Sequence, residues 1–242
     1  MHWKRYNKDA PYSYTLGPFP TMELIDQRAD LVEEILISPE FRQKEELIRK
    51  LEEKGLPYRL GDKEVNRLAH KGNTYVIGIF RKETSPVYGG NHVVLHEISD
   101  MGNLGNICRT MLAMDCRDLV TIGNCCDYHD PRTVRASMGA LFYLRHEHFA
   151  CMEDYLQAFG SGRKLYLFML SEKAETLPRL AVEEPWSLVF GNEGRGLPPE
   201  MARFGKGVMI PQSEDVDSLN LTTAVAIGLY QVQNFLKKET KE

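Results

Sequence analysis

The sequence predicts an α/β protein in which a small α/β domain precedes a larger one built on a parallel sheet. Short apolar runs bounded by turn residues recur along the chain, and segments with a helical period separate them. The polar, turn-rich segment Lys82–Gly90 interrupts this series and marks a linker. We therefore expect an irregular arm over residues 1–20, a first domain over residues 21–85 and a second over residues 91–242.

The elements of the first domain follow from its apolar pattern. An apolar run predicts a strand over residues 31–37. Ser38 and Pro39 resemble a helix start with proline at the first helical position, and Gly55 resembles a helix stop. The pattern then predicts a strand over 57–60, a helix from Asp62 through Leu68 and a strand over 74–80.

The second domain begins with the predicted strand His92–His96, followed by a polar turn and a helix that carries Arg109 near its start. Asp130 and Pro131 mark a further helix start, because aspartate caps a helix and proline suits its first position. Further strands are predicted over 119–122, 165–170, 186–190 and 208–211. The last helix, about Leu221–Leu236, is apolar on more than one face, so a second chain or the first domain must cover it.

The composition is that of an ordinary globular protein, with 242 residues, 43% of them hydrophobic and 26% charged. The longest apolar runs are strand-length, far short of the roughly 20 residues that a membrane-spanning helix needs. The amino-terminal residues lack the apolar core of a signal peptide. We expect a cytoplasmic protein with no membrane partner.

The net charge of −4 speaks against a broad basic surface of the kind that binds nucleic acids. Residues 1–90 hold 15 Lys and Arg against 14 Asp and Glu, and residues 91–242 hold 15 against 20. The excess acid therefore lies in the second domain. Any contact with a nucleic acid must be local.

The cysteines and histidines predict neither disulfides nor a metal site. The five cysteines are odd in number, include the adjacent pair Cys125 and Cys126 and form no C-x-x-C motif. We interpret them as reduced thiols in the interior. His146 and His148 have no acid or cysteine partner at metal-ligand spacing, and we interpret both as surface residues.

Two loops in the last quarter of the chain predict one ligand pocket. The apolar run Trp186–Phe190 ends in the glycine-rich loop Gly191–Leu197, and the run Val208–Pro211 is followed by Ser218–Asn220. Ligands of α/β sheets bind outside the carboxyl ends of the strands, and glycines let a ligand lie against the backbone. The order G-x-x-G-x-G reverses the dinucleotide fingerprint and comes late in the chain, so a dinucleotide site is not indicated.

Two charged residues allow more than one interpretation. Glu193 is either a solvated loop charge or an acceptor directed into the pocket. Arg109 either points toward the end of the preceding strand, where a ligand would lie, or is a surface arginine paired with Asp115 or Asp118. Asn103 and Gly105, just before it, favour a functional role.

Taken together, three motifs resemble the SpoU/TrmH family of SPOUT RNA ribose 2′-O-methyltransferases. The first is Asn103–Thr110, an Asn-x-Gly followed four residues after the glycine by an arginine. The second is Phe190–Leu197, and the third combines Ile210-Pro211 with Ser218–Asn220. The resemblance covers about residues 91–238, with a fainter likeness of residues 14–85 to the substrate-binding domain of the family.

The resemblance implies a SPOUT-type knotted parallel-sheet methyltransferase domain and a smaller N-terminal α/β substrate-binding domain. In that fold, the carboxyl-terminal segment that contains residues 205–230 threads through a loop formed by the preceding strands to give a deep trefoil knot, and two copies form a homodimer. True knots are rare exceptions to the usual rules of chain topology, so this expectation rests on the resemblance alone.

The resemblance also implies the reaction and the residues that support it. S-adenosylmethionine is the implied cofactor, held by Gly191, Ile210 and Leu219, and its methyl group goes to the ribose 2′-hydroxyl of a tRNA or rRNA nucleotide. The implied catalytic residues are Arg109, Asn103, Glu193, Ser218 and Asn220. No metal is implied.

Three further residues stay open. Arg132 and Arg135 either bind RNA phosphates or are simply exposed, and Gln212 departs from the methionine that many members carry. A guanidinium is almost never deprotonated, so Arg109 suits orienting the hydroxyl through the adjacent phosphate better than it suits a base.

Two rivals are less well supported. A non-catalytic RNA-binding protein with this fold would not need the complete polar set. A nucleotide-dependent oxidoreductase lacks the early glycine fingerprint. The sequence does not indicate which RNA or which nucleotide is modified.

Overall fold

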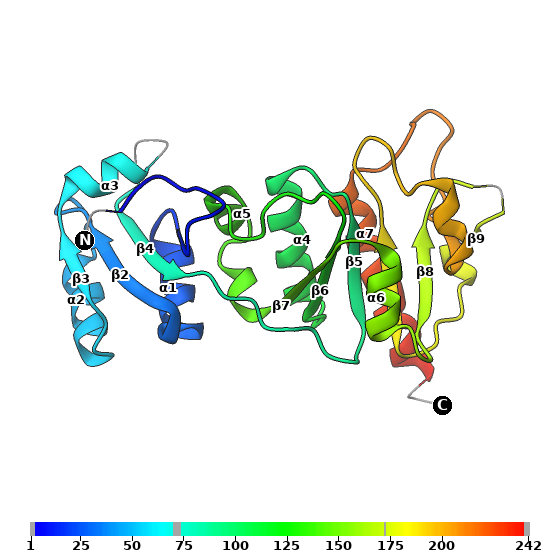
Figure 1. The fold of residues 1–242 in the computed structure, drawn as a ribbon, viewed down its shortest axis with the longest axis horizontal. Helices are drawn as coiled ribbons and strands as arrows, with labels where there is room; N and C mark the ends of the chain where they lie inside the picture. Colours follow the sequence, from blue (N-terminus) through cyan, green and yellow to red (C-terminus); the bar gives the residue numbers. More distant parts are fainter. Residues whose placement is uncertain (1–2, 70–73, 172, 240–242) are drawn as a thin grey trace. The chain divides into compact units, whose positions relative to one another are not determined.

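The computed structural model describes residues 3–69, 74–171 and 173–239, with side chains in the last helix through residue 235. Its contacts divide the chain into two compact units (Figure 1). The smaller unit joins residues 1–83 to the segment Asp127–Tyr143, and the larger unit joins Thr84–Cys126 to residues 144–242. From the sequence, Asp127–Tyr143 was expected within the second domain; by its contacts it groups with the smaller unit.

The smaller unit is built on a four-stranded mixed sheet in the order β1-β4-β2-β3. Its strands are β1 (Tyr12–Tyr14), β2 (Val32–Ile37), β3 (Tyr58–Leu60) and β4 (Val76–Arg81). Its α-helices are α1 (Pro18–Gln27), α2 (Lys44–Glu53), α3 (Asp62–Leu68) and α5 (Pro131–Ala136). The predicted helix start at Asp130 is confirmed, because the Asp130 side chain accepts a hydrogen bond from the amide of Arg132.

Two predictions for the smaller unit are wrong. The irregular arm predicted over residues 1–20 is too long, since Tyr12–Tyr14 form β1 and α1 begins at Pro18. The helix predicted at Ser38 and Pro39 begins only at Lys44, because the Ser38 hydroxyl lies 2.5 Å from the Asp62 carboxylate and caps a turn by accepting from the Glu40 amide.

The larger unit contains a seven-stranded sheet in the order β7-β6-β5-β10-β8-β11-β9, and all of its strand pairings are parallel. Its strands are β5 (His92–His96), β6 (Asp118–Ile122), β7 (Arg145–Phe149), β8 (Lys164–Phe168), β9 (Glu175–Thr176), β10 (Trp186–Phe190) and β11 (Lys206–Met209). Every residue of β10 and β6 is buried, which explains why both strands are mainly apolar and do not alternate with polar residues. The predicted α/β fold with a parallel sheet is confirmed.

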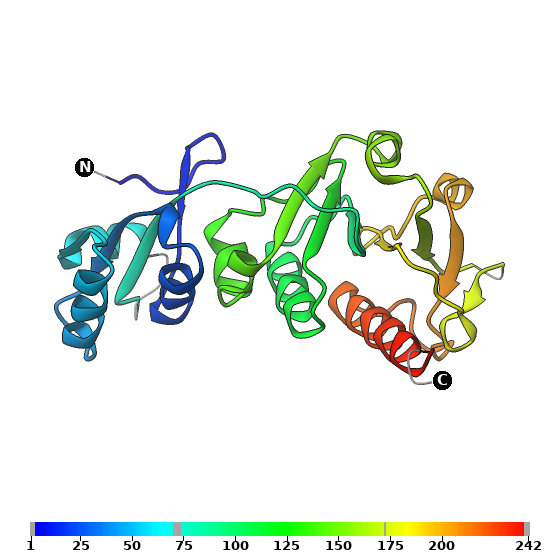
Figure 2. The same cartoon turned by 90° about the horizontal axis from the view of Figure 1, so that it is seen from below.

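Helices cover both faces of this sheet. They are α4 (Met101–Ala113), α6 (Met152–Phe159) and α7 (Leu221–Glu239). Helices α4 and α7 pack against each other on one face, and α6 lies on the opposite face (Figure 2). The sheet is therefore buried between helices, as a parallel sheet requires.

Strand β7 was not predicted, and its histidines were interpreted as surface residues. Its sequence, Arg-His-Glu-His-Phe, contains no apolar run because it is an edge strand. His146 is nevertheless buried, with Nε2 2.9 Å from the Thr121 hydroxyl, so the surface interpretation is wrong for this residue. His148 is exposed, as expected.

Helix α7 is apolar on two faces, as predicted. Val225, Leu229 and Val232 are fully buried within the chain. Ile227 is 37% exposed and Tyr230 60% exposed on another face. Leu236, predicted on the buried stripe, lies beyond the described side chains.

The five cysteines are free thiols, of which Cys108 and Cys116 are buried and the other three are partly exposed. No helix within the described ranges has both the length and the apolar character needed to cross a membrane.

Candidate functional site

A pocket of about 790 Å³ opens at the carboxyl ends of β8, β10 and β11 in the larger unit. The loops that follow these strands and the start of α7 form its walls. Five of the predicted site residues line it: Gly191, Glu193, Ile210, Ser218 and Leu219. The two late loops therefore do meet in one pocket.

The glycine-rich loop after β10 closes tightly on itself. A Cβ atom at Gly191 would lie 2.2 Å from the carbonyl carbon of Gly196, a distance that no real side chain tolerates. The Gly196 amide donates to the Asn192 carbonyl at 2.9 Å, and Gly196 has a left-handed φ of 67°. Glycine is thus required at 191 by close backbone approach and at 196 by conformation.

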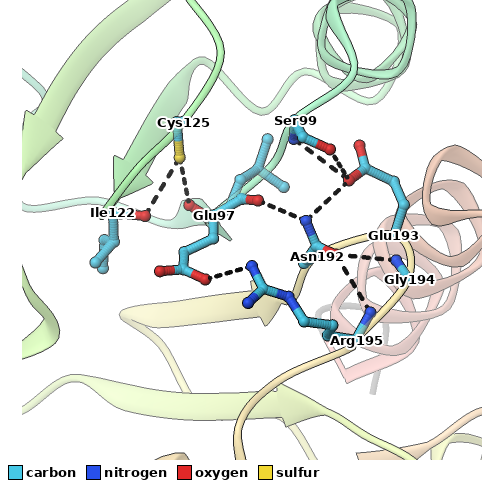
Figure 3. Close-up of polar contacts among 9 residues, drawn as sticks. Glu97, Ser99, Ile122, Cys125, Asn192, Glu193, Gly194 and Arg195 are labelled. Atoms are coloured by element: carbon cyan, nitrogen blue, oxygen red, sulfur yellow. Dashed lines mark hydrogen bonds and ion pairs between the residues drawn. The ribbon is translucent and has the colours of Figure 1, made fainter.

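The Asn192 side chain organises the same loop from inside (Figure 3). Its Oδ1 accepts from the amides of Gly194 at 3.0 Å and Arg195 at 3.2 Å. Its Nδ2 donates to the carbonyl of Glu97, just after β5, at 2.8 Å. One amide side chain therefore satisfies the turn and ties it to the neighbouring strand end.

Glu193 connects the loop to the start of α4. Its Oε2 accepts from the amide and hydroxyl of Ser99 at 3.3 and 3.1 Å, and its Oε1 accepts from the Asp100 amide at 3.3 Å and from Asn103 Nδ2 at 3.2 Å. Partial burial raises the pKa of the Glu193 carboxyl, but these hydrogen bonds outweigh burial and bring the pKa below its ordinary value. Glu193 is a fixed, ionised acceptor.

The first motif is placed by the N-terminus of α4. Asp100 caps this helix, accepting from the Asn103 amide at 2.7 Å. Arg109 was expected near the start of this helix but lies beyond its middle; it is exposed and is not among the described residues that line the pocket. The two acids considered as its surface partners pair elsewhere, Asp115 with Arg117 and Asp118 with Arg145.

Two residues in or next to the third motif, Asn220 and Gln212, make hydrogen bonds that shape the chain around the pocket. Asn220 lies just before α7, and its Oδ1 accepts from the Thr222 amide at 2.9 Å, as an N-cap residue does. Gln212 lines the pocket, and its side-chain amide lies 3.4 Å from the Val216 carbonyl, across the loop. Among the predicted polar residues, Asn220 and Asn103 act on the loops rather than on the pocket wall.

The floor of the pocket is aromatic. Phe168 and Phe190, the last residues of β8 and β10, stack with ring centroids 4.3 Å apart. Helix α7 approaches them at Gly228, where a Cβ atom would lie 2.8 Å from the Phe168 ring. The pocket therefore combines an apolar wall of two stacked rings with the polar loops that follow the strands.

Arg132 and Arg135 belong to the smaller unit, on α5. Both side chains are exposed. Arg132 forms two hydrogen bonds with Asp130, Nε to Oδ1 at 2.9 Å and Nη2 to Oδ2 at 2.8 Å. Its charge is therefore partly compensated, whereas Arg135 lies on the next turn of the same short helix.

Sequence reasoning missed Ser99, Asp100 and Asn192. Asp100 had a detectable signal, because an aspartate just before a helical pattern is a typical cap. Asn192 lies inside the glycine loop that the sequence singled out, so its position was a signal although its role was not predicted. Ser99 had no signal, since its partner Glu193 is 94 positions away in the sequence.

Comparisons with known proteins show which family the sequence and the fold resemble. The SpoU rRNA Methylase family model matches residues 90–230. An uncharacterized tRNA/rRNA methyltransferase of Synechocystis is 30% identical over 142 residues, covering 58% of this chain and 52% of the relative. The 23S rRNA (uridine(2479)-2′-O)-methyltransferase of Streptomyces viridochromogenes is 29% identical and covers 54% of this chain and 47% of the relative. The chain thus spans about half the length of these relatives.

A solved structure matches nearly the whole chain. The crystal structure of an AdoMet-bound rRNA methyltransferase from Sinorhizobium meliloti aligns with a TM-score of 0.80 at 26% identity, covering 93% of this chain and 88% of that one. The likeness therefore extends over both units. Since the family model matches more than half of the sequence and includes all three predicted motifs, the chain belongs to the SpoU rRNA Methylase family.

Proposed function

We propose that this chain transfers the methyl group of S-adenosylmethionine to the ribose 2′-hydroxyl of a tRNA or rRNA nucleotide. The observation that carries the proposal is the Glu193–Asn103 hydrogen bond, which joins the first motif to the glycine loop at the edge of the pocket. The names of the matched relatives support RNA as substrate, and one of them names a 2′-O position. The AdoMet-bound neighbour supports the cofactor.

The pocket suits S-adenosylmethionine in size and chemistry. Its volume of about 790 Å³ is within the range of roughly 300–1,000 Å³ typical of small-molecule sites. Phe190, Ile210 and Leu219 give apolar surface for an adenine ring, and the loop backbone gives polar groups for its edge. Glu193 and Asp217 line the same pocket, and their negative charge suits a cationic ligand.

When bound, S-adenosylmethionine supplies an electrophilic methyl group. The chain's residues then have to orient the nucleophilic hydroxyl, and such positioning accounts for much of the rate in transfers of this kind. Arg109 is exposed and cationic, and we assign it to the phosphate next to the target ribose. Asn103 and Glu193 keep α4 and the glycine loop in register, so that the nucleotide and the pocket stay aligned.

We also propose that two copies of the chain form a homodimer through α7. The exposed side chains of Ile227 and Tyr230 support it. They form an apolar face on α7 that the described part of the chain does not cover, and a second copy would remove it from water. The trefoil knot near residues 205–230 and a cytoplasmic location remain predictions from the family resemblance.

The smaller unit is proposed to select the RNA. It carries nearly balanced charge, so a few exposed cations must make the contacts. Arg135 and Arg132 on α5 remain our candidates. A protein that binds RNA without catalysis is the alternative, and the retained Asn103, Arg109 and Glu193 speak against it.

The experiment has two parts. Titration calorimetry measures S-adenosylmethionine binding by the full chain, and transfer of labelled methyl groups is followed with unmodified tRNA and rRNA. Modified nucleosides are then identified by mass spectrometry, which separates ribose from base methylation. Arg109→Ala should abolish transfer and retain cofactor affinity. Methyl groups found only on bases would refute the 2′-O assignment, and cofactor binding without transfer to any RNA would favour the non-catalytic alternative.

A further inference from the structure

Glu97 has a backbone conformation that its residue type disfavours. It directly follows β5 and has a left-handed φ of 55°. Residues other than glycine, asparagine and aspartate seldom adopt this region, and it persists only where the surroundings hold it. A glycine would adopt this conformation without strain. Because the chain has a glutamate instead, contacts of this residue have to compensate for the energy of the strained backbone.

The conformation lets Glu97 bind on two sides. Its amide donates to the Ile122 carbonyl at 2.9 Å, which fixes it to the end of β6. Its carbonyl accepts from Asn192 Nδ2 at 2.8 Å, and its carboxylate accepts from Arg195 Nη2 at 3.1 Å (Figure 3). Glu97 therefore holds the glycine loop at two points, once through the backbone and once through the side chain.

The neighbouring turn leaves room for this side chain. Gly123, directly after β6, has a left-handed φ of 74°, and a Cβ atom there would lie 3.2 Å from Glu97 Cγ. The ends of β5, β6 and β10 are thus connected through one glutamate. Arg195 and Asn192, its two partners, both line the pocket.

We propose that Glu97 is a positioning residue that holds the glycine loop, and with it Arg195, in the conformation that binds the cofactor. The inference rests on the proposed function, because it takes the pocket to be the S-adenosylmethionine site. Glu97 does not line the pocket itself; it acts through Asn192 and Arg195. Within the part of the chain that the structure describes, the other hydrogen bonds that hold the loop are those within it and those of Glu193 to the start of α4.

Two single variants and their combination test the contact between Glu97 and Arg195. Glu97→Gln keeps the shape and weakens the bond to Arg195, and Arg195→Gln removes the same bond from the other side. Both should weaken S-adenosylmethionine binding roughly two- to fivefold, since exposed ion pairs contribute up to about 1 kcal/mol. The double variant should bind no worse than either single variant, because the two changes remove one interaction.

Glu97→Gly gives the readout that a purely structural role does not predict. It relieves the backbone strain and keeps the carbonyl, but removes the carboxylate. Its melting temperature should stay within about 2 °C of wild type, since relief of strain offsets the greater freedom of the unfolded glycine chain. Its cofactor affinity should nevertheless fall to the level of Glu97→Gln.

Asp115 offers a matched control. It also has a left-handed φ, of 52°, and an ion pair with a nearby arginine, Arg117, but it does not line the pocket. Asp115→Gly should leave cofactor affinity unchanged. The affinities are measured by titration calorimetry and the melting temperatures by calorimetry on the full chain.

The outcomes are distinct. Weaker binding in Glu97→Gln, Arg195→Gln and Glu97→Gly, with wild-type affinity in Asp115→Gly, supports the positioning role. Wild-type affinity in Glu97→Gln and Arg195→Gln overturns it, while the proposed function stands. A wild-type chain that does not bind S-adenosylmethionine overturns the proposed function and this inference together.

Discussion

At the scale of single residues, backbone space decides what the glycine loop tolerates. Gly191 and Gly194 stand in the same loop, yet a Cβ atom would meet the Gly196 carbonyl carbon at 2.2 Å in the first case and only the Asn192 Oδ1 atom at 3.7 Å in the second. The second distance is an ordinary contact. The two glycines therefore separate a steric requirement from general loop composition.

We predict that Gly191→Ala weakens S-adenosylmethionine binding at least tenfold, because the loop has to open to admit the methyl group. Gly194→Ala serves as the control and should bind within about twofold of wild type, since alanine fits the space beside Asn192. Titration calorimetry measures both. Equal affinities for the two variants would show that the cofactor does not depend on this closed loop.

Much of the site was predictable at this scale, and the remainder has a physical reason. Gly191, Ile210 and Leu219 lie at or after the ends of strand-like runs, where an α/β sheet binds its ligand, and all three line the pocket. Glu97 and Ser99 were not predictable, because their partners in the glycine loop are more than 90 positions away. Only the folded sheet brings these strand ends together.

At the scale of elements, the base of β5 carries a buried histidine. His92 Nε2 donates to the Tyr88 carbonyl at 2.5 Å, and its Nδ1 faces the Tyr155 hydroxyl at 2.8 Å. Burial, and to a lesser extent the nearby Arg163, lowers the pKa of His92 to about 4. The neutral ring is thus the folded form, and the hydrogen bonds match its tautomer.

This histidine predicts how stability depends on pH. In the unfolded chain its pKa is about 6.5, so between pH 6.5 and 4 the unfolded state binds a proton that the folded state does not. The free energy of unfolding therefore falls as pH drops from 6.5 toward 4. At pH 5.5 the contribution is about 1 kcal/mol.

The measurement compares wild type with His92→Gln by urea denaturation at pH 7.5 and 5.5. Other titrating groups are common to both proteins, so the difference in their pH dependence isolates His92. Glutamine removes the titration, and the loss of stability on acidification should be smaller in the variant by about 1 kcal/mol. The same loss in both proteins would show that His92 binds its proton equally well in the folded and the unfolded chain.

Helix α7 presents its exposed apolar pair for a second prediction at this scale. We expect Ile227→Glu combined with Tyr230→Glu to convert a dimer into monomers, because two charges would be buried in the proposed interface. Light scattering after size exclusion gives the mass. Gln157→Glu with Ala158→Glu, at exposed positions of α6, is the control and should leave the mass unchanged. A monomeric wild type would refute the interface.

Strands with strong apolar patterns were predictable, whereas the edge strands β1 and β7 were not. Strands β5, β6 and β10 are buried on both faces and were found from their apolar runs. Strand β7 lies at an edge, and β1 spans only Tyr12–Tyr14, so neither has a pattern long enough to recognise. Local sequence cannot show that such segments complete a sheet.

At the scale of the whole molecule, the chain leaves the smaller unit and returns to it. The segment Asp127–Tyr143 belongs to this unit, where Phe142 packs edge-to-face on Phe80 with ring centroids 5.2 Å apart. The Ser13 hydroxyl also donates to the His129 carbonyl. No local pattern predicts such a return. A fragment that begins after the linker would expose this segment, so deletion is a poor test of the unit's role, and surface substitutions are preferable.

We predict that the double variant Arg132→Ala and Arg135→Ala binds RNA more weakly and with a shallower dependence on salt. Each phosphate contact that is lost should lower the slope of log affinity against log salt by about 0.7 to 0.9. Affinity is measured for transcribed rRNA and tRNA at several salt concentrations. Both side chains are exposed, so the fold should tolerate the change.

Arg42 and Arg49, exposed cations elsewhere on the smaller unit, give the control pair. Their replacement by alanine removes the same net charge from the same unit, so any general effect of charge on RNA affinity appears in both double variants. Only the α5 pair should lower the slope of log affinity against log salt by the amount expected for lost phosphate contacts. If the control pair lowers the slope and the α5 pair does not, the RNA lies on another face of this unit, and α5 has no part in selecting it.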